Sequence, residues 1–224
     1  MGLENHLQAL SALTGIPEFH ALRRTLTFKV GVVFDFQTRK NDTVRIDLPA
    51  TIEDYPVTET QERIVRALQS DLPVDTRPFA RLGEIHGFSE ADLLSFAHHA
   101  KGKALRRYVA TFRHRKMGIS ANGMTVWNVH PDCLPDAGKK LATAREVSHC
   151  YARSTFVDFP YNLYSMLHGP DSQTIGQRAA ELSAEINAPN YLILESPTEF
   201  KKTRLRYFLP ELAEWWRNHE RLAA

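Results

Sequence analysis

Cysteine is scarce in this chain, which has only Cys133 and Cys150 among its 224 residues. Two cysteines cannot build a disulfide framework, and they lack the CxxC spacing of zinc and redox sites, so we expect both to be small buried hydrophobic side chains. No apolar run approaches the roughly 20 residues that cross a bilayer. The first residues also lack the basic and long apolar regions of a signal peptide, which predicts a cytoplasmic protein with no membrane contact.

Acidic residues are missing from two stretches, although the net charge of the whole chain is only +2. From Leu93 to Pro131 there are seven lysines and arginines and no acid, and from Phe200 to Pro210 there are four. Such basic clusters predict a polyanionic partner, either nucleic acid or a small ligand with several carboxylates or phosphates. The alternative for either cluster is a solvated charged surface.

The length and composition favour one main domain with a smaller module, because 43% of the residues are hydrophobic and sufficient for a buried core. Residues 1–55 form an N-terminal extension in which leucines near the start predict a short amphipathic helix. A strand at 25–36 and a second at 43–48, joined by a polar turn, predict a hairpin there. The sequence assigns no role to this extension.

Residues 56–104 have the pattern of three short helices. Pro78 suits the first position of the middle helix, which we expect to end at Gly87. Two capping boxes mark the starts of the outer helices, formed by Thr58 with Gln61 and by Ser89 with Asp92. Helix, glycine-containing turn and helix at this spacing predict a winged-helix-like helix-turn-helix domain.

Residues 105–208 predict a sheet domain, and residues 209–224 a C-terminal helix. The expected elements are strands at 105–112 and 121–129, a helix at 134–144, strands at 147–153 and 161–168, a helix at 172–186 and a strand at 191–195. From residue 121 this is the βαββαβ order of a ferredoxin-like domain, an antiparallel sheet with both helices on one face. The predicted fold class is therefore α+β, and dimerisation is the usual way to cover the second face.

This architecture resembles that of the Lrp/AsnC transcription regulators, and four motifs make the resemblance more specific. They are FRHRKMG at 112–118, EVSHCY at 146–151, FPYNLYSMLHG at 159–169 and FKKTRLRYF at 200–208. In this order they are similar to the siroheme decarboxylases, the Lrp/AsnC-like enzymes of alternative haem and haem d1 synthesis. The resemblance covers roughly residues 57–208.

The resemblance implies removal of the carboxyls of two acetate side chains of siroheme, at ring positions twelve and eighteen, to give didecarboxysiroheme. It implies no organic cofactor, with the iron-containing siroheme as substrate. It also implies a homodimer, or a heterodimer with a sister subunit, that holds the tetrapyrrole between open sheet faces. Whether the isolated chain is active is left open.

Decarboxylation requires a proton donor for the new carbon, and histidine suits this role near neutral pH. On a regular strand His149, Tyr151 and Arg153 share one face, with the small residues Ser148, Cys150 and Ala152 on the other. The small residues suit the side beneath the packed helices, and the large polar ones suit a face that contacts a ligand. His149 is accordingly the first candidate donor, with His114 and Tyr151 as further catalytic candidates. His114 or His168 is also a candidate axial contact to the substrate iron.

A tetrapyrrole with eight carboxylates should be recognised as a polyanion, with arginine forks and lysine charges binding its carboxylates. The candidate substrate-binding residues are Arg113, Arg115, Lys116, Tyr161, Asn162, Tyr164, His168, Lys202, Arg204 and Arg206. The tyrosines can equally be packing residues of an interface. Asp158 is expected either to position a histidine or to cap a turn.

The rival function is a DNA-binding regulator or a haem-binding sensor. The start of the third helix, which would enter the major groove, carries Glu90 and Asp92 and no lysine or arginine. Negative charges there repel the phosphate backbone, so DNA is an unfavoured partner. The sequence does not separate a sensor from an enzyme.

Overall fold

The computed structural model describes residues 3–30, 33–34, 41–42, 55–105, 108, 121–195, 198, 200–201 and 203–223. The chain divides into two compact units. The first comprises Met1–Phe19, Ile52–Thr111 and Lys201–Ala224, and the second comprises His20–Thr51 and Phe112–Phe200. Within the described ranges, none of the helices has both the length and the apolar character needed to span a membrane.

Three helices form the core of the first unit: α2 (Glu59–Leu68), α3 (Pro78–His86) and α4 (Glu90–Ala100). Both predicted capping boxes are present, at Thr58 and Ser89, and α3 ends at Gly87, whose φ of 75° is in the left-handed region that favours glycine. The buried side chains of the three helices form one cluster around Leu68, Leu82 and Leu93. The expected three-helix pattern is thus confirmed.

The remainder of the first unit comes from both ends of the chain. Helix α1 (Leu3–Thr14) contacts a 3-10 helix, η3 (Glu220–Ala223), which follows α7 (Pro210–His219). The ring of His6 lies 4.8 Å from that of Trp215. The segment before α7 is attached to α2 and its C-cap, because Gln69 exchanges hydrogen bonds with the backbone of Tyr207 at 2.7 and 2.8 Å.

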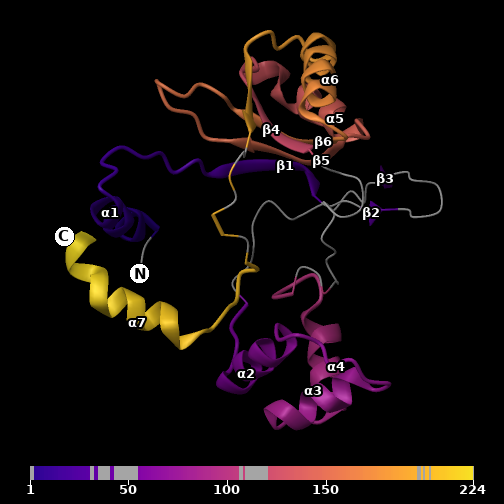
Figure 1. Ribbon diagram of the computed structural model, residues 1–224, viewed down its shortest axis with the longest axis vertical. Coiled ribbons are helices and arrows are strands. Elements are labelled where there is room, and N and C mark those ends of the chain that lie inside the picture. Colours follow the sequence, from indigo (N-terminus) through magenta and orange to yellow (C-terminus); the bar gives the residue numbers. More distant parts are fainter. Residues whose placement is uncertain are drawn as a thin grey trace. The chain divides into compact units, whose positions relative to one another are not determined.

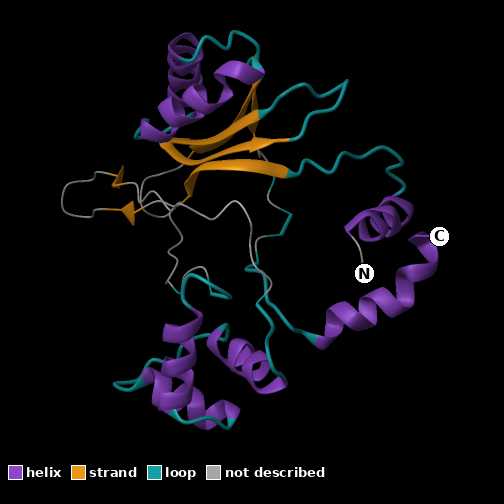
Figure 2. Ribbon diagram, turned by 180° about the vertical axis from the view of Figure 1, so that it is seen from behind, coloured by secondary structure: helices purple, strands orange, loops and turns teal. Residues whose placement is uncertain are grey.

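The second unit contains a five-stranded sheet in the order β1-β5-β6-β4-β7, with all pairs antiparallel (Figures 1 and 2). The strands are β1 (Arg24–Val30), β4 (Ala121–Trp127), β5 (Val147–Arg153), β6 (Leu163–Gly169) and β7 (Tyr191–Glu195). Short strands β2 (Val33–Phe34) and β3 (Asn41–Asp42) pair separately. From β4 to β7 the order is ferredoxin-like, which confirms the predicted α+β fold.

Helices α5 (Leu134–Thr143) and α6 (Ser172–Glu185) lie on the same face of the sheet (Figure 1), and a short 3-10 helix, η2 (Pro131–Cys133), precedes α5. They enclose the main core, to which Trp127, Leu141 and Leu167 contribute fully buried side chains. The Trp127 indole donates a hydrogen bond of 2.9 Å to the buried Ser165 hydroxyl. This core fixes one face of every strand toward the helices.

Strand β1 extends the ferredoxin-like sheet, which the sequence did not predict. The expected strand at 25–36 is observed as β1 and β2, and its expected hairpin partner at 43–48 lies outside the described residues, as does most of 105–112. Phe28 of β1 packs directly against Gly138 of α5, where a Cβ atom would collide with the aromatic ring. This close approach requires glycine at position 138.

The two cysteines differ in their surroundings. Cys150 is fully buried, and burial raises the pKa of its thiol to about 12, so it remains a neutral, small side chain. Cys133 is exposed at the end of η2, so the expectation that both are buried is wrong for this residue. The physical reason is that η2, the short 3-10 helix that carries Cys133, buries none of its residues.

Gly138→Ala is expected to lower the free energy of unfolding by roughly 1–3 kcal/mol, because the added methyl group would displace the Phe28 ring. Gly176→Ala is the matched control, since among the described residues no atom lies within 4 Å of the added Cβ. Better helix propensity should make that variant more stable by up to about 1 kcal/mol. Urea denaturation followed by circular dichroism measures both, and equal effects would contradict the packing argument.

Lys29→Met is expected to stabilise the protein by about 2 kcal/mol at pH 7. Burial lowers the pKa of Lys29 from 10.5 to about 8, despite the opposing effects of Cys150 and Glu146, which corresponds to a cost of about 3 kcal/mol for the charged form. The substitution removes one hydrogen bond of 2.8 Å to the Ala144 carbonyl, worth about 1 kcal/mol. That carbonyl keeps the Val147 amide as a donor.

The same pKa shift predicts a pH dependence. Between pH 8 and 9 the unfolded chain retains the Lys29 proton that the folded chain loses, so the stability of the unaltered protein should rise with pH in this window. Above pH 9 the raised pKa of the Cys150 thiol acts in the opposite direction, because the unfolded chain then loses a thiol proton that the folded chain keeps. The rise should be smaller in Lys29→Met and unchanged in Lys139→Met, an exposed lysine of α5. Denaturation curves at both ends of the window measure it, and identical slopes in all three proteins would refute the assignment.

Candidate functional site

We call the side of the sheet opposite α5 and α6 the open face. Strand alternation brings to it, among others, Met124 and Val126 of β4, His149, Tyr151 and Arg153 of β5, Tyr164, Met166 and His168 of β6, and Leu192 and Leu194 of β7. The predicted shared orientation of the three β5 residues is consistent with the burial pattern, in which Cys150 and Ala152 are fully buried between them. The open face combines titratable, aromatic and apolar side chains.

Two histidines meet at one end of the open face. The Ser148 hydroxyl lies 2.9 Å from Nδ1 of His149 and 2.7 Å from Nε2 of His168. Ser148 is only 2% exposed, whereas both imidazoles are half-buried. Ser148 thus links His149 and His168, both of which the sequence predicted as site residues. The sequence analysis had placed Ser148 itself on the helix-covered face.

The direction of Ser148 follows from an irregularity in the sheet. Residues of β5 and β6 pair in register from His149 onward, but the register shifts between Val147 and His149. A β-bulge of this kind inserts one extra residue and interrupts the strict alternation of side chains. The expectation that Ser148 faces the helices together with Cys150 is therefore wrong.

Arg153 lies between two tyrosines farther along the open face. Its guanidinium carbon is 5.7 Å from the ring centroid of Tyr151 and 5.4 Å from that of Tyr164, distances that allow cation–π attraction. It also donates a hydrogen bond of 2.8 Å to the Leu22 carbonyl. Burial raises the pKa of the Tyr164 phenol and the Arg153 charge opposes this shift, so the phenol is neutral and available as a donor.

Tyr161 and Asn162 have structural contacts at the start of β6. The Asn162 amide donates to the Val129 carbonyl at 2.7 Å and accepts from the Val129 amide at 3.0 Å. Tyr161 is 9% exposed and its hydroxyl donates to Asn190 at 3.4 Å. Both contacts fasten the chain that enters β6.

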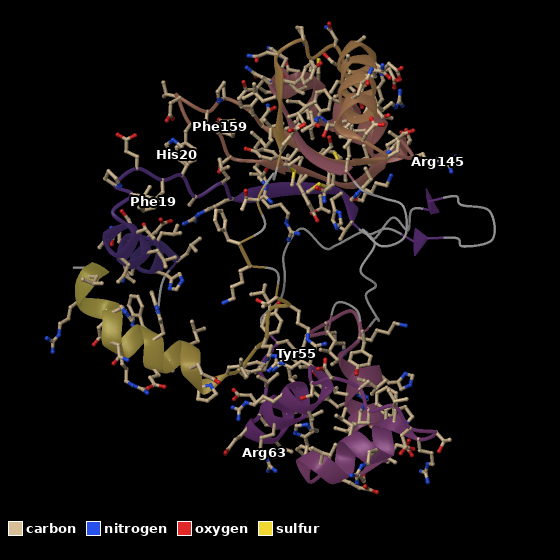
Figure 3. The ribbon with its side chains drawn as sticks, viewed as in Figure 1. Phe19, His20, Tyr55, Arg63, Arg145 and Phe159 are labelled. Atoms are coloured by element: carbon tan, nitrogen blue, oxygen red, sulfur yellow. The ribbon has the colours of Figure 1, made fainter. Side chains whose placement is uncertain are left out.

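The loop between β5 and β6 is attached to the segment before β1 (Figure 3). The imidazole of His20 stacks on Phe156 with ring centroids 4.0 Å apart, and its Nε2 lies 2.8 Å from Asp158. This contact agrees with the expectation that Asp158 positions a histidine, and the hydrogen bond holds the pKa of its carboxyl below the usual range. The partner histidine, His20, is one that the sequence analysis had not considered.

The remaining candidates are not placed on the open face by the described residues. Arg204 and Arg206 belong to the first unit, where Arg204 pairs with Asp71 at 2.6 Å. Five candidates lie outside the described residues: Arg113, His114, Arg115, Lys116 and Lys202. Among the sequence-predicted candidates, the described residues therefore place only those of β5 and β6 on the open face.

Sequence reasoning missed two residues of this cluster as functional candidates. Arg153 was recognised as sharing the face of His149, and that alternation was the signal that could have added it to the carboxylate-binding candidates. Ser148 gave no such signal, because the bulge that reorients it depends on pairing with β6.

Comparison with known proteins gives matches to both parts of the chain. Residues 61–105 match the family model of the siroheme decarboxylase NirDL-like HTH domain, and residues 116–201 match that of the AsnC-like ligand-binding domain. The siroheme decarboxylase of Hydrogenobacter thermophilus is 33% identical over 96% of this chain and 64% of its own length. The siroheme decarboxylase beta subunit of Oleidesulfovibrio alaskensis is 35% identical over 67% of this chain and 97% of its own.

A solved structure gives a similar result. The crystal structure of the siroheme decarboxylase NirDL, in co-complex with an iron-uroporphyrin III analogue, is 29% identical with a TM-score of 0.69. The match covers 97% of this chain and 62% of that one. This chain therefore spans a little under two thirds of the length of the first relatives, although it covers nearly all of the shorter beta subunit.

Tyr164→Phe is expected to maintain or raise stability, by up to about 1 kcal/mol. Among the described residues no hydrogen-bond partner reaches the buried Tyr164 hydroxyl, so its removal relieves a desolvation cost. Tyr161→Phe, the matched control, should lower stability by roughly 0.5–1 kcal/mol because its hydroxyl is bonded to Asn190. Thermal and urea unfolding distinguish them; a marked loss for Tyr164→Phe would mean that its hydroxyl has a structural partner.

Proposed function

The chain belongs to the siroheme decarboxylase family, and on this basis we propose that it is a carboxy-lyase acting on siroheme. It removes the carboxyl groups of two acetate side chains, at ring positions twelve and eighteen, to give didecarboxysiroheme for haem or haem d1 synthesis. The observation that carries the proposal is the grouping of His149, His168 and Arg153 with two tyrosines on the open face of a sheet whose domain matches the AsnC-like ligand-binding domain.

The reaction breaks a carbon–carbon bond and leaves an electron pair on the acetate carbon. The conjugated ring of the substrate accepts that pair, so the proposal requires no separate cofactor. The protein must orient the ring, remove water from the departing carboxylate and supply one proton to the new methyl group. Carbon dioxide leaves as the second product.

His149 is the proposed proton donor. It lies on the open face, half-buried, and its ring centroid is 6.1 Å from that of Tyr151. Its Nδ1 lies 2.9 Å from the Ser148 hydroxyl, a contact that orients the imidazole. Tyr151 and His114 stay further catalytic proposals, the second from outside the described residues.

Carboxylate binding is proposed for the cations and phenols around this histidine. Arg153 and the buried phenol of Tyr164 are supported by their position on the open face. The resemblance to the family supports six further residues in this role: Arg113, Arg115, Lys116, Lys202, Arg204 and Arg206. Tyr161, Asn162 and His168 are retained as proposed substrate contacts, and His114 or His168 as an axial contact to the iron.

We propose that the active form contains a second subunit, either another copy of this chain or a sister protein. Several relatives are named as beta, NirH or NirL subunits of siroheme decarboxylase. Leu192 and Leu194 of the open face are about two-fifths exposed, which suits an interface. A second sheet on the open face would exclude water from a bound tetrapyrrole.

The charge at the start of α4 weighs against a DNA regulator. Glu90 pairs with Arg77 at 2.5 Å, and Asp92 is part of the Ser89 capping box. Both acids are therefore structural parts of the helix that would have to approach phosphates. We propose that the helix-turn-helix domain serves assembly rather than DNA recognition.

Anaerobic incubation of the purified chain with siroheme, followed by mass analysis of the extracted tetrapyrrole, tests the function. We expect the loss of two molecules of carbon dioxide per siroheme. Siroheme that stays bound and unchanged would contradict turnover by this chain alone and favour a sensor or a partner-dependent subunit. Failure to bind siroheme would refute the proposal.

The same assay tests the proton donor. His149→Ala should lower kcat by roughly 10²- to 10⁴-fold, the range typical of a lost general acid, while siroheme still binds. His130→Ala is the control, because this histidine of the same unit is exposed beside Asp132, away from the open face. An unchanged kcat in His149→Ala would exclude His149 as the donor.

A further inference from the structure

The basic motif before α7 is held by the helix-turn-helix domain, in the same unit of the chain. Gln69, the C-cap of α2, makes two hydrogen bonds with the backbone of Tyr207. Its side-chain amide donates to the Tyr207 carbonyl at 2.8 Å and accepts from the Tyr207 N–H at 2.7 Å. One turn earlier in α2, Arg66 donates from Nε to the Phe208 carbonyl at 2.6 Å. Two consecutive residues of the motif are thus fastened to one end of α2.

A second attachment lies nearer the start of the motif. The Arg204 guanidinium pairs with Asp71, just beyond the end of α2, at 2.6 Å. We call residues 204–208, from the first attachment to the last, the clamped segment. Phe208 has a φ of 56°, in the left-handed region that residues other than glycine seldom adopt. Such a conformation persists where surrounding contacts impose it, and the hydrogen bonds to α2 supply them here.

Between its two attachments the clamped segment presents a cation beside apolar groups. Arg206 is exposed, and among the described residues its guanidinium has no hydrogen bond or ion pair. Its neighbours Leu205 and Tyr207 are 81% and 61% exposed. An arginine between an exposed leucine and an exposed tyrosine suits a ligand that combines a flat apolar ring with carboxylates. This combination distinguishes the segment from a surface that is merely charged and solvated.

We propose that α2 holds the clamped segment as part of the siroheme-binding surface. Gln69 is the positioning residue, and Arg206 is the group that pairs with a carboxylate of the substrate. The inference rests on the proposed function, in which siroheme is the substrate. Gln69 does not touch siroheme and acts only through the backbone of Tyr207. The helix-turn-helix domain thereby contributes to substrate binding, a role that requires no DNA.

The physical reason for such a clamp is the cost of ordering a segment when a ligand binds. A segment that is already fixed loses little conformational freedom on binding, so more of the interaction energy appears as affinity. Release of the segment should therefore weaken binding without slowing the chemical step. A change of this kind raises KM and leaves kcat unaltered.

The experiment compares the full chain with Gln69→Ala, which removes both hydrogen bonds to Tyr207. Ser70→Ala is the matched control, because the Ser70 hydroxyl donates to the Arg66 carbonyl within the same end of α2 at 3.1 Å. It removes a hydrogen bond from the helix end and none from the clamped segment. Thermal unfolding verifies that each variant retains its fold.

The first readout is trypsin cleavage after Arg206, identified by mass analysis of the fragments and measured without substrate. The protease must bind the backbone around this bond, where Gln69 occupies both polar groups of Tyr207. Cleavage tracks the population of released segment when opening is fast. With two hydrogen bonds lost, Gln69→Ala should be cut roughly 10-fold faster. Ser70→Ala should be cut at the unaltered rate.

The second readout is anaerobic titration with siroheme, followed by its visible absorbance. Gln69→Ala should raise Kd and KM by roughly 3- to 10-fold with little change in kcat, because only chains with a clamped segment are competent to bind. Arg206→Ala should weaken binding at least as much. Adding Gln69→Ala to it should cost little more, since both act through the same contact. Siroheme should also slow trypsin cleavage after Arg206 in the unaltered chain.

The outcomes separate the clamp from its role. An unchanged cleavage rate in Gln69→Ala, or an equal increase in Ser70→Ala, would overturn the clamp. Faster cleavage with unchanged siroheme affinity would overturn the role in substrate binding. Failure of the unaltered chain to bind siroheme would contradict the proposed function and this role with it, whereas the cleavage rates alone report whether α2 holds the segment. Gln69→Glu keeps the acceptor for the Tyr207 N–H but loses the donor, and should give intermediate values.

Discussion

The pairing of β5 with β1 on one side and β6 on the other is the constraint on which the rest of the second unit depends. Burial of Cys150 and Ala152 against the helices obliges the residues between them to face the opposite way. The histidine, tyrosine and arginine of β5 reach the open face for this reason. The proposed site residues of β5 are thus positioned by the same core that stabilises the fold.

The irregular pairing between β5 and β6 brings a hydroxyl group into contact with two imidazoles. The bulge beside Val147 gives the Ser148 hydroxyl access to two histidines, while the regular part of the strand places Arg153 between two tyrosine rings. One end of the open face therefore offers groups that exchange protons, and the other offers a cation and phenols that suit carboxylates. Under the proposed function, proton delivery and substrate binding are separated along a single strand.

The helix-turn-helix domain has the fold of a DNA-binding domain but lacks the positive charge that such a domain needs at the start of α4. Its capping boxes and its buried cluster are intact. Yet the acids at the start of α4 accept hydrogen bonds from Arg77 and Ser89, in the place where a DNA-binding helix needs cations. Fold likeness to transcription regulators is therefore a poor guide to activity, and the side chains must decide it.

Local signals in the sequence determined most of the elements. The caps at Thr58 and Ser89 and the Gly87 helix end were predicted from a few adjacent residues, and β5 and β7 were predicted with their observed bounds. Alternation along β5 also predicted that His149 and Tyr151 share a face. These features depend on propensity and periodicity, which neighbouring residues define.

Only the tertiary structure decided the contacts between segments that are far apart in the chain. The addition of β1 to the sheet, the fit of Phe28 against Gly138 and the pairing of His20 with Asp158 each join residues separated by more than a hundred positions. The orientation of Ser148 likewise depends on the register with β6. Register and strand order are set by which faces can be buried together, and a single sequence read locally does not contain that choice.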